Sequence, residues 1–170
     1  FIAHSPLGEQ LEFRSMEGTE QLSRLFEFRV RLLSDSPSIS AKSLLGKDMS
    51  IEIDLTTEDA GSGKRFISGQ VTQFTYIGRD GDFSAYQAVL RPWLWHATRR
   101  SDFKIFQFKK APDIIKEVLG KYGFSIEDKL MGNYREWTYM VQYGESDFNF
   151  VSRLMEEDGI FYFFSHSNGS

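Results

Sequence analysis

The sequence of 170 residues contains no cysteine, only four prolines and three histidines. Without cysteine, the chain can form neither disulfides nor thiolate metal sites, and it has no cysteine nucleophile. This usage is consistent with a cytosolic origin. No apolar run approaches the roughly 20 residues that a membrane-spanning helix requires. A net charge of −4 provides no general attraction to nucleic acid or anionic lipid.

Residues that could support catalysis are scattered. His4, His96 and His166 lie in different regions, and no His-Glu-x-x-His or Gly-x-Ser-x-Gly segment is present. The segment 61–64 resembles part of a phosphate-binding loop, but Glu58 stands where the first glycine is required and a strand pattern follows. We therefore predict no enzyme activity, no cofactor and no metal site.

The first half of the sequence predicts an antiparallel sheet. Hydrophobic and charged residues alternate from 26 to 32, which indicates one buried and one solvated face. Shorter strand patterns occur at 11–13, 51–55 and 83–90, and a long one at 66–77, within which Gly69 predicts a bulge or bend. A helical turn is predicted at 40–45, with Ser40 as cap and Gly46 as stop, and turns at 60–63 and 78–82. This spacing favours a barrel or a strongly bent sheet.

The second half is mixed. A short strand is predicted at 104–108, and a helix begins near Pro112 and ends at Gly120 or Gly123. From 137 to 143 large apolar residues alternate as in a strand, which Gly144 interrupts. Ser146 is suited to cap a following helix, with Asp147 in its first turn.

That helix is predicted to end at Gly159, because glycine adopts the left-handed conformation at little cost. Residues 160–164 form an apolar run that predicts a buried strand, so the whole segment is a strand–helix–strand unit. Four large side chains are predicted to lie in the core: Trp137, Phe148, Leu154 and Phe163.

Three adjacent acids, Glu156, Glu157 and Asp158, occupy the last turn of this helix, where the helix dipole disfavours negative charge. Arg153 is placed to reach Glu156 or Glu157 along the helix. Adjacent carboxylates do not frame a sugar-sized cleft, so a glycosidase pair is not indicated. Our hypothesis is that one of these acids has a fixed cationic or N–H partner from a neighbouring segment or subunit.

Residues 91–110 combine six basic residues with a single acid, and aromatic rings lie among them. A nucleic-acid groove would have this composition. The rings, however, fall at positions that the strand and helix patterns assign to the core, and the chain is acidic overall. We interpret the segment as a basic rim that meets an acidic partner or another protomer.

The residues from 134 onward resemble the N-terminal hub region of the VgrG family, the spike proteins of type VI secretion. One match is Tyr134-Arg135-x-Trp137-x-Tyr139-x-Val141-Gln142-Tyr143-x-Glu145-Ser146-Asp147, running on to Phe150. Another is Arg153-Leu154-Met155-Glu156-Glu157-Asp158-Gly159-Ile160-x-Tyr162-Phe163. Shorter matches lie upstream, at 17–26, 44–47, 69–71, 90–95 and 105–107. The structural signature comprises Trp137, Tyr139, Tyr143, Glu145, Asp147, Phe150, Arg153, Leu154, Glu156, Glu157 and Gly159.

This resemblance implies a mainly β fold with some α (α+β), in two β-rich, barrel-like modules of the contractile phage tail hub type. The change of pattern near Arg99–Asp102 places the first module at 1–99 and a second, mixed α/β module at 100–170. It implies a structural role in a homotrimeric hub that docks on the Hcp tube and baseplate and helps deliver effector cargo. No nucleic acid is implied, and a membrane only through a needle beyond this chain. The protein would reside in the bacterial cytoplasm before firing and then be secreted or injected into a target cell.

The sequence lacks an initial Met and stops before the OB-like domain and β-helical needle of the resembled proteins, so we expect a fragment. Two alternatives stay open: a hub protein of a contractile phage tail or tailocin, and a glycan-binding β-module. The glycan-binding alternative predicts a row of solvent-facing Trp or Tyr. The sequence leaves undetermined the cargo, the interface residues and the oligomeric state of the fragment.

Overall fold

The computed structural model describes residues 1–55 and 63–168, which form two compact units. Unit 1 comprises residues 1–92 together with the segment that begins at Phe163, and unit 2 comprises residues 93–162. This division differs from the predicted one, which separated 1–99 from 100–170. The 3-10 helix η3 (Trp93–Arg99) belongs to unit 2, and the end of the chain returns to unit 1.

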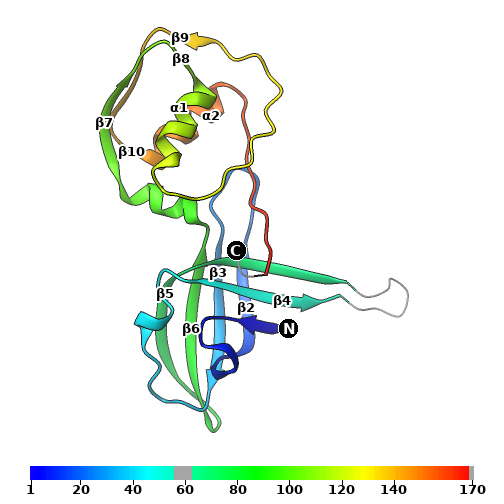
Figure 1. Ribbon diagram of the computed structural model, residues 1–170. Helices are drawn as coiled ribbons and strands as arrows, with labels where there is room; N and C mark the ends of the chain where they lie inside the picture. The colour runs from blue at the N-terminus through cyan, green and yellow to red at the C-terminus, as the bar shows by residue number, and fades with distance from the viewer. Residues whose placement is uncertain (56–62, 169–170) are drawn as a thin grey trace. The chain divides into compact units, whose positions relative to one another are not determined.

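Unit 1 is built on a six-stranded antiparallel sheet that curls like a half-barrel, with the order β1-β4-β5-β6-β3-β2 (Figure 1). Its strands are β1 (Ile2–His4), β2 (Glu12–Thr19), β3 (Glu27–Ser34), β4 (Asp48–Asp54), β5 (Lys64–Asp80) and β6 (Phe83–Arg91). Two 3-10 helices, η1 (Gly8–Gln10) and η2 (Ala41–Ser43), lie between them. The mainly β architecture with helices confirms the predicted fold class.

The core of unit 1 follows the predicted alternation in β3. Phe28, Val30 and Leu32 are at most 7% exposed, while Arg29 and Arg31 face solvent. Each such side chain contributes about 1.5–3 kcal/mol by leaving water. The alternation therefore both specifies the strand and fixes which of its faces covers the core.

Gly69 does not form the predicted bulge. It pairs in regular register with Met49, and a Cβ there would lie 3.0 Å from the ring of Phe26 and 3.1 Å from the carbonyl oxygen of Arg91. Close packing rather than a bend explains the glycine. The register shifts of β5 lie further on, at 71–73 and 76–78.

The three predicted turns differ in how far the structure agrees with them. The turn at 78–82 is a hairpin, tighter than predicted, in which only Gly81 and Asp82 separate β5 from β6 and Gly81 has φ +64°. At 40–45 the helical turn is present as η2 and Gly46 has φ +72°, but the Ser40 side chain makes no cap hydrogen bond. The predicted turn at 60–63 lies outside the described residues, apart from Gly63.

Unit 2 contains two helices and two small antiparallel sheets (Figure 1). After η3 come β7 (Ser101–Phe106), β8 (Lys109–Lys110), α1 (Ala111–Gly120), β9 (Glu136–Trp137), β10 (Met140–Ser146) and α2 (Asp147–Glu157). Strand β7 pairs with β10, and β8 pairs with β9. The apolar sides of the two helices form the core: Ile114, Ile115, Val118, Leu119, Phe150, Val151, Leu154 and Met155.

Both ends of α2 are confirmed as predicted. The Ser146 hydroxyl accepts a hydrogen bond from the Asn149 amide at 3.1 Å. Gly159 has φ +67°, and the amide of Ile160 donates to the carbonyl of Met155 at 2.8 Å. This is the backbone pattern with which a glycine closes a helix and satisfies its last carbonyls.

The predicted buried strand at 160–164 is wrong. These residues form no strand, and Phe161 and Phe163 are 63% and 64% exposed. An apolar run becomes a strand only where a neighbouring strand pairs with its backbone. Phe164 instead packs its ring against Phe26, with centroids 5.3 Å apart. Residues 163–168, which belong to unit 1, run over it as an extended segment that we call the strap.

The strap is tied to the unit 1 sheet by polar contacts as well. The amide of Ser68 donates to Nδ1 of His166 at 2.9 Å, and Nε2 of His166 lies 3.1 Å from Oε1 of Glu20. The Ser50 hydroxyl donates to Asn168 at 3.0 Å. Residues about one hundred positions apart in the sequence thus complete one unit.

Candidate functional site

The segment of unit 2 that carries the sequence-predicted signature is held by a fully buried carboxylate. Asp147, the first residue of α2, is 0% exposed. Its Oδ1 accepts from Gln142 Nε2 at 2.8 Å. Its Oδ2 accepts from the Tyr122 hydroxyl at 2.6 Å and from Lys121 Nζ at 2.7 Å. We call these four residues the Asp147 network.

Electrostatics keep the Asp147 network charged. Burial alone would raise the pKa of Asp147, but the hydrogen bonds from Gln142, Lys121 and Tyr122 outweigh it, so the pKa lies below its usual value. The N-terminal end of α2 favours the negative charge in the same sense. Burial and the hydrogen bond to Asp147 both raise the pKa of Tyr122. The carboxylate therefore stays ionised and the phenol neutral at physiological pH.

Sequence reasoning placed Asp147 in the first turn of a helix but missed its three partners. Lys121 and Tyr122 follow α1, some 25 residues upstream, and no local pattern marks them. Gln142 is a polar residue between the large side chains of the strand alternation, and its burial to 1% exposure was not predicted. Its Oε1 has no hydrogen-bond partner among the described residues.

The strand alternation at 137–143 is present, but the large side chains of its odd-numbered positions do not face the core. Met140 and Gln142 point into unit 2, at 7% and 1% exposure, whereas Tyr139 and Tyr143 are 56% and 81% exposed. Gly144 does not interrupt the strand either, because β10 continues to Ser146 with a shift in its register. A period of two shows that a strand is present but does not determine which face is buried.

Arg153 makes a different ion pair from the expected one. It reaches neither Glu156 nor Glu157 but lies 2.5 Å from Glu145, and its Nη2 donates to the carbonyl of Val141 at 3.2 Å. The helix packs back on the strand that precedes it, so a partner on β10 is nearer than one along the helix. The pair ties α2 to β10.

Glu157 has the cationic partner from a neighbouring segment that the hypothesis required. Arg135 donates to it at 3.0 Å, and the guanidinium carbon of Arg135 lies 3.3 Å from the ring centroid of Trp137. Planar stacking of this kind orients the guanidinium toward the carboxylate. An effect on assembly stays a prediction.

Of the four predicted core side chains, only Leu154 is fully buried, at 0% exposure. Trp137 and Phe148 are half-buried and Phe163 is exposed. The indole Nε1 of Trp137 is shielded from solvent without a partner among the described residues. Trp137 lies on the two-residue strand β9, which pairs with β8.

Two further signature residues, Phe150 and Glu156, are respectively packed in the core and exposed to solvent. Phe150 is fully buried and stacks on Phe106 of β7, with centroids 5.5 Å apart. Glu156 is exposed, and no ion pair involving it is present in the described part of the chain. These positions point to packing and solvation rather than to reactive chemistry.

The three histidines are not brought together. His4 lies 2.9 Å from Glu52 in unit 1, His166 belongs to the strap, and His96 packs beside Trp95 in unit 2. Across residues 1–55 and 63–168, no group of three His, Asp or Glu is arranged to hold a metal ion. No helix in this part of the chain has the length and apolar character to cross a membrane.

The aromatic rings of 91–110 do not all lie in the core, which corrects the reason given against a nucleic-acid groove. Phe106 is buried, but Phe103 and Phe108 are 71% and 65% exposed. The tryptophans do not form the row that glycan binding predicts, since Trp93 stacks on Phe124 and all three are half-buried. Two exposed tyrosines occur instead at Tyr139, just before β10, and at Tyr143 on it.

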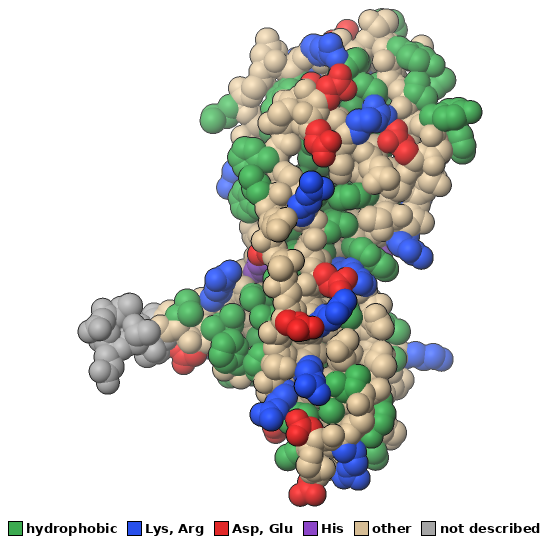
Figure 2. Space-filling model, turned by 180° about the vertical axis from the view of Figure 1, so that it is seen from behind, with side chains coloured by type: hydrophobic (Ala, Val, Ile, Leu, Met, Phe, Trp, Pro, Cys, Tyr) green, Lys and Arg blue, Asp and Glu red, His purple; other side chains and the backbone are tan. Residues whose placement is uncertain are grey.

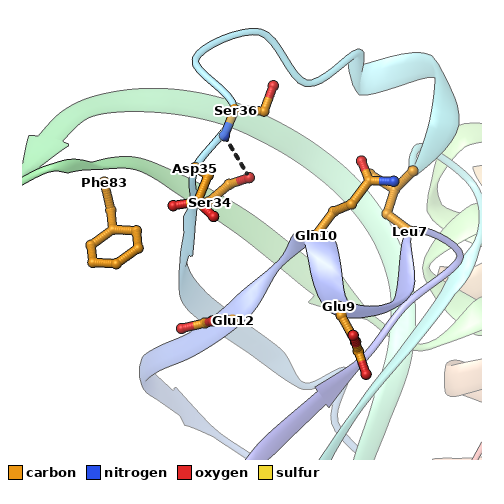
Figure 3. A pocket seen from close by; sticks show the side chains of 8 residues that line it. All are labelled: Leu7, Glu9, Gln10, Glu12, Ser34, Asp35, Ser36 and Phe83. Atoms are coloured by element: carbon orange, nitrogen blue, oxygen red, sulfur yellow. Dashed lines mark hydrogen bonds between the residues drawn. The ribbon is translucent and has the colours of Figure 1, made fainter.

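One pocket of about 490 Å³ lies in unit 1 (Figure 3). Its lining comes from around η1, the start of β2, the end of β3 and the start of β6. Three carboxylates, Glu9, Glu12 and Asp35, surround it with the ring of Phe83. Its charged lining residues are all acidic, and none of them forms an ion pair in the described part of the chain.

Comparison with known proteins gives a consistent assignment. A family model described as phage tail baseplate hub (GPD) matches residues 19–170. The chain is 48% identical over 164 residues to the type VI secretion system spike protein VgrG1c of Pseudomonas aeruginosa, and 47% identical over 163 residues to VgrG1a of the same organism. Each match covers 95% of this chain but only 22% and 25% of the relative.

A more distant relative is the actin cross-linking toxin VgrG1 of Vibrio cholerae, 29% identical over 177 residues, of which the match covers 15%. Among solved structures, the Escherichia coli c3393 protein is similar, with a TM-score of 0.78 and 28% identity. The match covers 92% of this chain and 43% of that one. That protein is described as a type VI secretion component with structural similarity to the T4 phage tail proteins gp27 and gp5.

Proposed function

Because this chain belongs to the phage tail baseplate hub family, we propose that it is the hub region of a type VI secretion spike. The observation that carries the proposal is the 47–48% identity to two spike proteins over 95% of the chain. The chain spans about a quarter of those relatives, so the proposal concerns one region of a larger protein.

The structure supports a mechanical role for this region. Unit 2 ties the start of α2 to β10 and to the end of α1 through the Asp147 network, and Arg153 adds a second tie to β10. Unit 1 is closed by the strap, which bonds to β4 and β5. Such contacts between distant segments resist local opening, which a part that transmits force requires.

In this proposal the region acts as a homotrimer in the full-length protein, docks on the Hcp tube and baseplate, and carries effector cargo. It performs no chemistry itself; toxic activity, where a spike has it, resides in other domains. The protein waits in the bacterial cytoplasm and is injected into the target cell with the spike. Those signature residues that are buried or form an ion pair act as a scaffold for these contacts.

A second candidate is the hub of a contractile phage tail or tailocin. The family description and the likeness of the c3393 protein to phage tail proteins favour this reading. Both candidates share the fold and the mechanical role, and they differ in the tube on which the hub docks.

A chimaera distinguishes them. The region of Pseudomonas aeruginosa VgrG1a that matches this chain is replaced by this chain in a strain without its other spike genes, and release of the Hcp tube protein into the medium is measured. The spike proposal expects release to be restored. A stable, abundant chimaera that supports no release contradicts the proposal and favours the phage-tail alternative.

A matched control uses the same chimaera with Glu156→Gln, an exposed position with no ion pair in the described part of the chain, which is expected to release tube protein normally. The variant Leu154→Ala, which opens a cavity in unit 2, is expected to reduce release in proportion to the loss of folded protein. If release of the tube protein did not depend on whether this region is folded, the region would be dispensable for release.

A further inference from the structure

The sheet of β7 and β10 exposes aromatic and aliphatic side chains on its outer face. Phe103 pairs across the strands with Tyr143, and Ile105 with Val141. The rings of Phe103 and Tyr143 meet edge to face, with centroids 5.2 Å apart. Phe103, Tyr143 and Ile105 are 71%, 81% and 56% exposed. With Tyr139, which continues the same alternation, these residues form what we call the β7–β10 face.

The β7–β10 face is large for a surface that stays in water. Each aromatic side chain offers about 150–250 Å², so the face exposes roughly 500 Å² of mostly apolar area, near the upper end for the largest patch on a monomer. A standard interface buries about 800 Å² on each partner. The face therefore supplies most of one side of such an interface.

Phe108 extends this exposed surface at an energetic cost. It is 65% exposed and adopts φ +52°, a left-handed conformation that costs about 1 kcal/mol or more outside glycine. Its amide donates to the carbonyl of Thr138 at 3.4 Å, next to Tyr139. Strained backbone conformations of this kind concentrate at functional sites. Figure 2 shows hydrophobic side chains gathered on the surface of unit 2.

Two positively charged residues that form no ion pair in the described part of the chain flank this face in the sequence. Arg100 immediately precedes β7, and Lys110 lies on β8; both are exposed. Neither forms an ion pair within residues 1–55 and 63–168, whereas Lys104 and Lys109 both pair with Glu117. The segment 100–110 thus carries exposed aromatic rings between two exposed basic residues, a combination that suits an acidic partner.

Unit 1 carries the complementary surface. The pocket in Figure 3 is lined by Glu9, Glu12 and Asp35, which are exposed and form no ion pair in the described part of the chain, and by Phe83, which is 38% exposed. Negative charge beside an aromatic ring in a cavity of about 490 Å³ suits a Lys or Arg side chain together with an apolar neighbour.

We propose that the β7–β10 face of one copy of this chain docks against the acidic pocket of unit 1 of a second copy. A contact between two different surfaces of one chain generates a ring when its rotation closes. This inference rests on the proposed hub function, for which it names the contact between protomers. The opposite charges fix the direction of the contact and the aromatic area supplies its stability.

The absence of cysteine makes a crosslinking test direct. Ser101→Cys places a thiol at the start of β7, and Gln10→Cys places one on the lining of the pocket; both residues are exposed. The two single variants of this chain are mixed at millimolar concentration and oxidised. The inference expects a disulfide-linked dimer in the mixture that contains one of each variant, and none in either variant alone.

The control is Met131→Cys, in the 121–135 connection of unit 2 and 98% exposed, which is expected to give no dimer with Gln10→Cys. Adding Arg100→Glu and Lys110→Glu to the Ser101→Cys chain should abolish the crosslink. A dimer of Ser101→Cys with itself would show that the face meets a copy of itself and would overturn the proposal.

If the mixture of Ser101→Cys and Gln10→Cys formed no disulfide-linked dimer, the proposed contact would be overturned as well. The restoration of tube release by the chimaera tests the hub function separately, because it is expected whichever surfaces the protomers use to meet. A chimaera that restores release while the mixture stays unlinked therefore rejects the contact alone. A crosslinked mixture together with a failed chimaera rejects the secretion role and keeps the contact.

Discussion

Replacing Asp147 by asparagine removes a charge that unit 2 has buried completely. The carboxylate accepts hydrogen bonds from Gln142, Tyr122 and Lys121 at 2.6–2.8 Å. Hydrogen bonds to charged groups contribute about 1.5–3 kcal/mol each, without being additive, and removing one partner of a buried ion pair costs about 3–5 kcal/mol. Asparagine keeps one acceptor oxygen, so we expect Asp147→Asn to lower the free energy of unfolding by about 3 kcal/mol.

Tryptophan fluorescence during urea unfolding measures this change selectively, because Trp93, Trp95 and Trp137 are the three tryptophans of the chain and all lie in unit 2. With a slope of about 2 kcal/mol per molar urea, the midpoint should fall by roughly 1.5 M. The control is Glu156→Gln, the same acid-to-amide change at an exposed site of the same helix, which should shift stability by no more than about 0.5 kcal/mol.

The pH dependence of the free energy of unfolding tests the same substitution in a second way. The pKa of Asp147 in the folded chain lies below its usual value of 3.8. Its contribution is therefore complete above pH 3.8 and is lost as the pH falls through the lowered folded-state pKa. The stabilities of the wild type and Asp147→Asn should converge as the pH falls below 3.8.

Two results would refute this reasoning. If Asp147→Asn lost no more stability than Glu156→Gln at neutral pH, the hydrogen bonds would not provide the stabilisation assigned to them. If the difference between wild type and Asp147→Asn stayed constant below pH 3.8, its origin would be the shape of the side chain rather than its charge.

Three further predictions concern α2. Leu154→Ala should cost about 3–4 kcal/mol, because Leu154 is 0% exposed and its cavity cannot fill from solvent; a loss below about 1 kcal/mol in urea unfolding would show that the core collapses around it. Gly159→Ala should cost about 1 kcal/mol, since φ is +67° there, and an unchanged melting temperature would argue against that conformation. Glu157→Gln should cost less than about 1 kcal/mol, because its pair with Arg135 is largely exposed, and 1 M salt should remove the difference; a salt-independent loss would contradict this.

Local chemistry made several elements predictable. Ser146 and Gly159 specify the two ends of α2 through bonds that span only a few residues, and Pro112 marks the start of α1. The alternation across β3 predicted a strand and its buried face together, because charged residues occupied every other position. In each case the residues that decide the structure are adjacent in the sequence.

Where the sequence misled, the deciding partner was distant. On β10 both phases of the alternation were apolar or uncharged, so only the packing of α1 and α2 decided that Met140 and Gln142 face inward. Arg153 chose Glu145 over its helical neighbours because α2 folds back on β10. The run at 160–164 pairs with no strand in the described part of the chain, and its last two residues begin the strap.

The sequence by itself determined the mostly β organisation, the ends of the helices and the resemblance to spike hub proteins, since these depend on short-range periodicity, caps and motif order. Only the tertiary structure decided that Asp147 is a buried anchor, that Tyr139 and Tyr143 face solvent, and that the strap belongs to unit 1. Burial is a property of what packs against a residue, and a side chain's own neighbours in the chain do not contain that information.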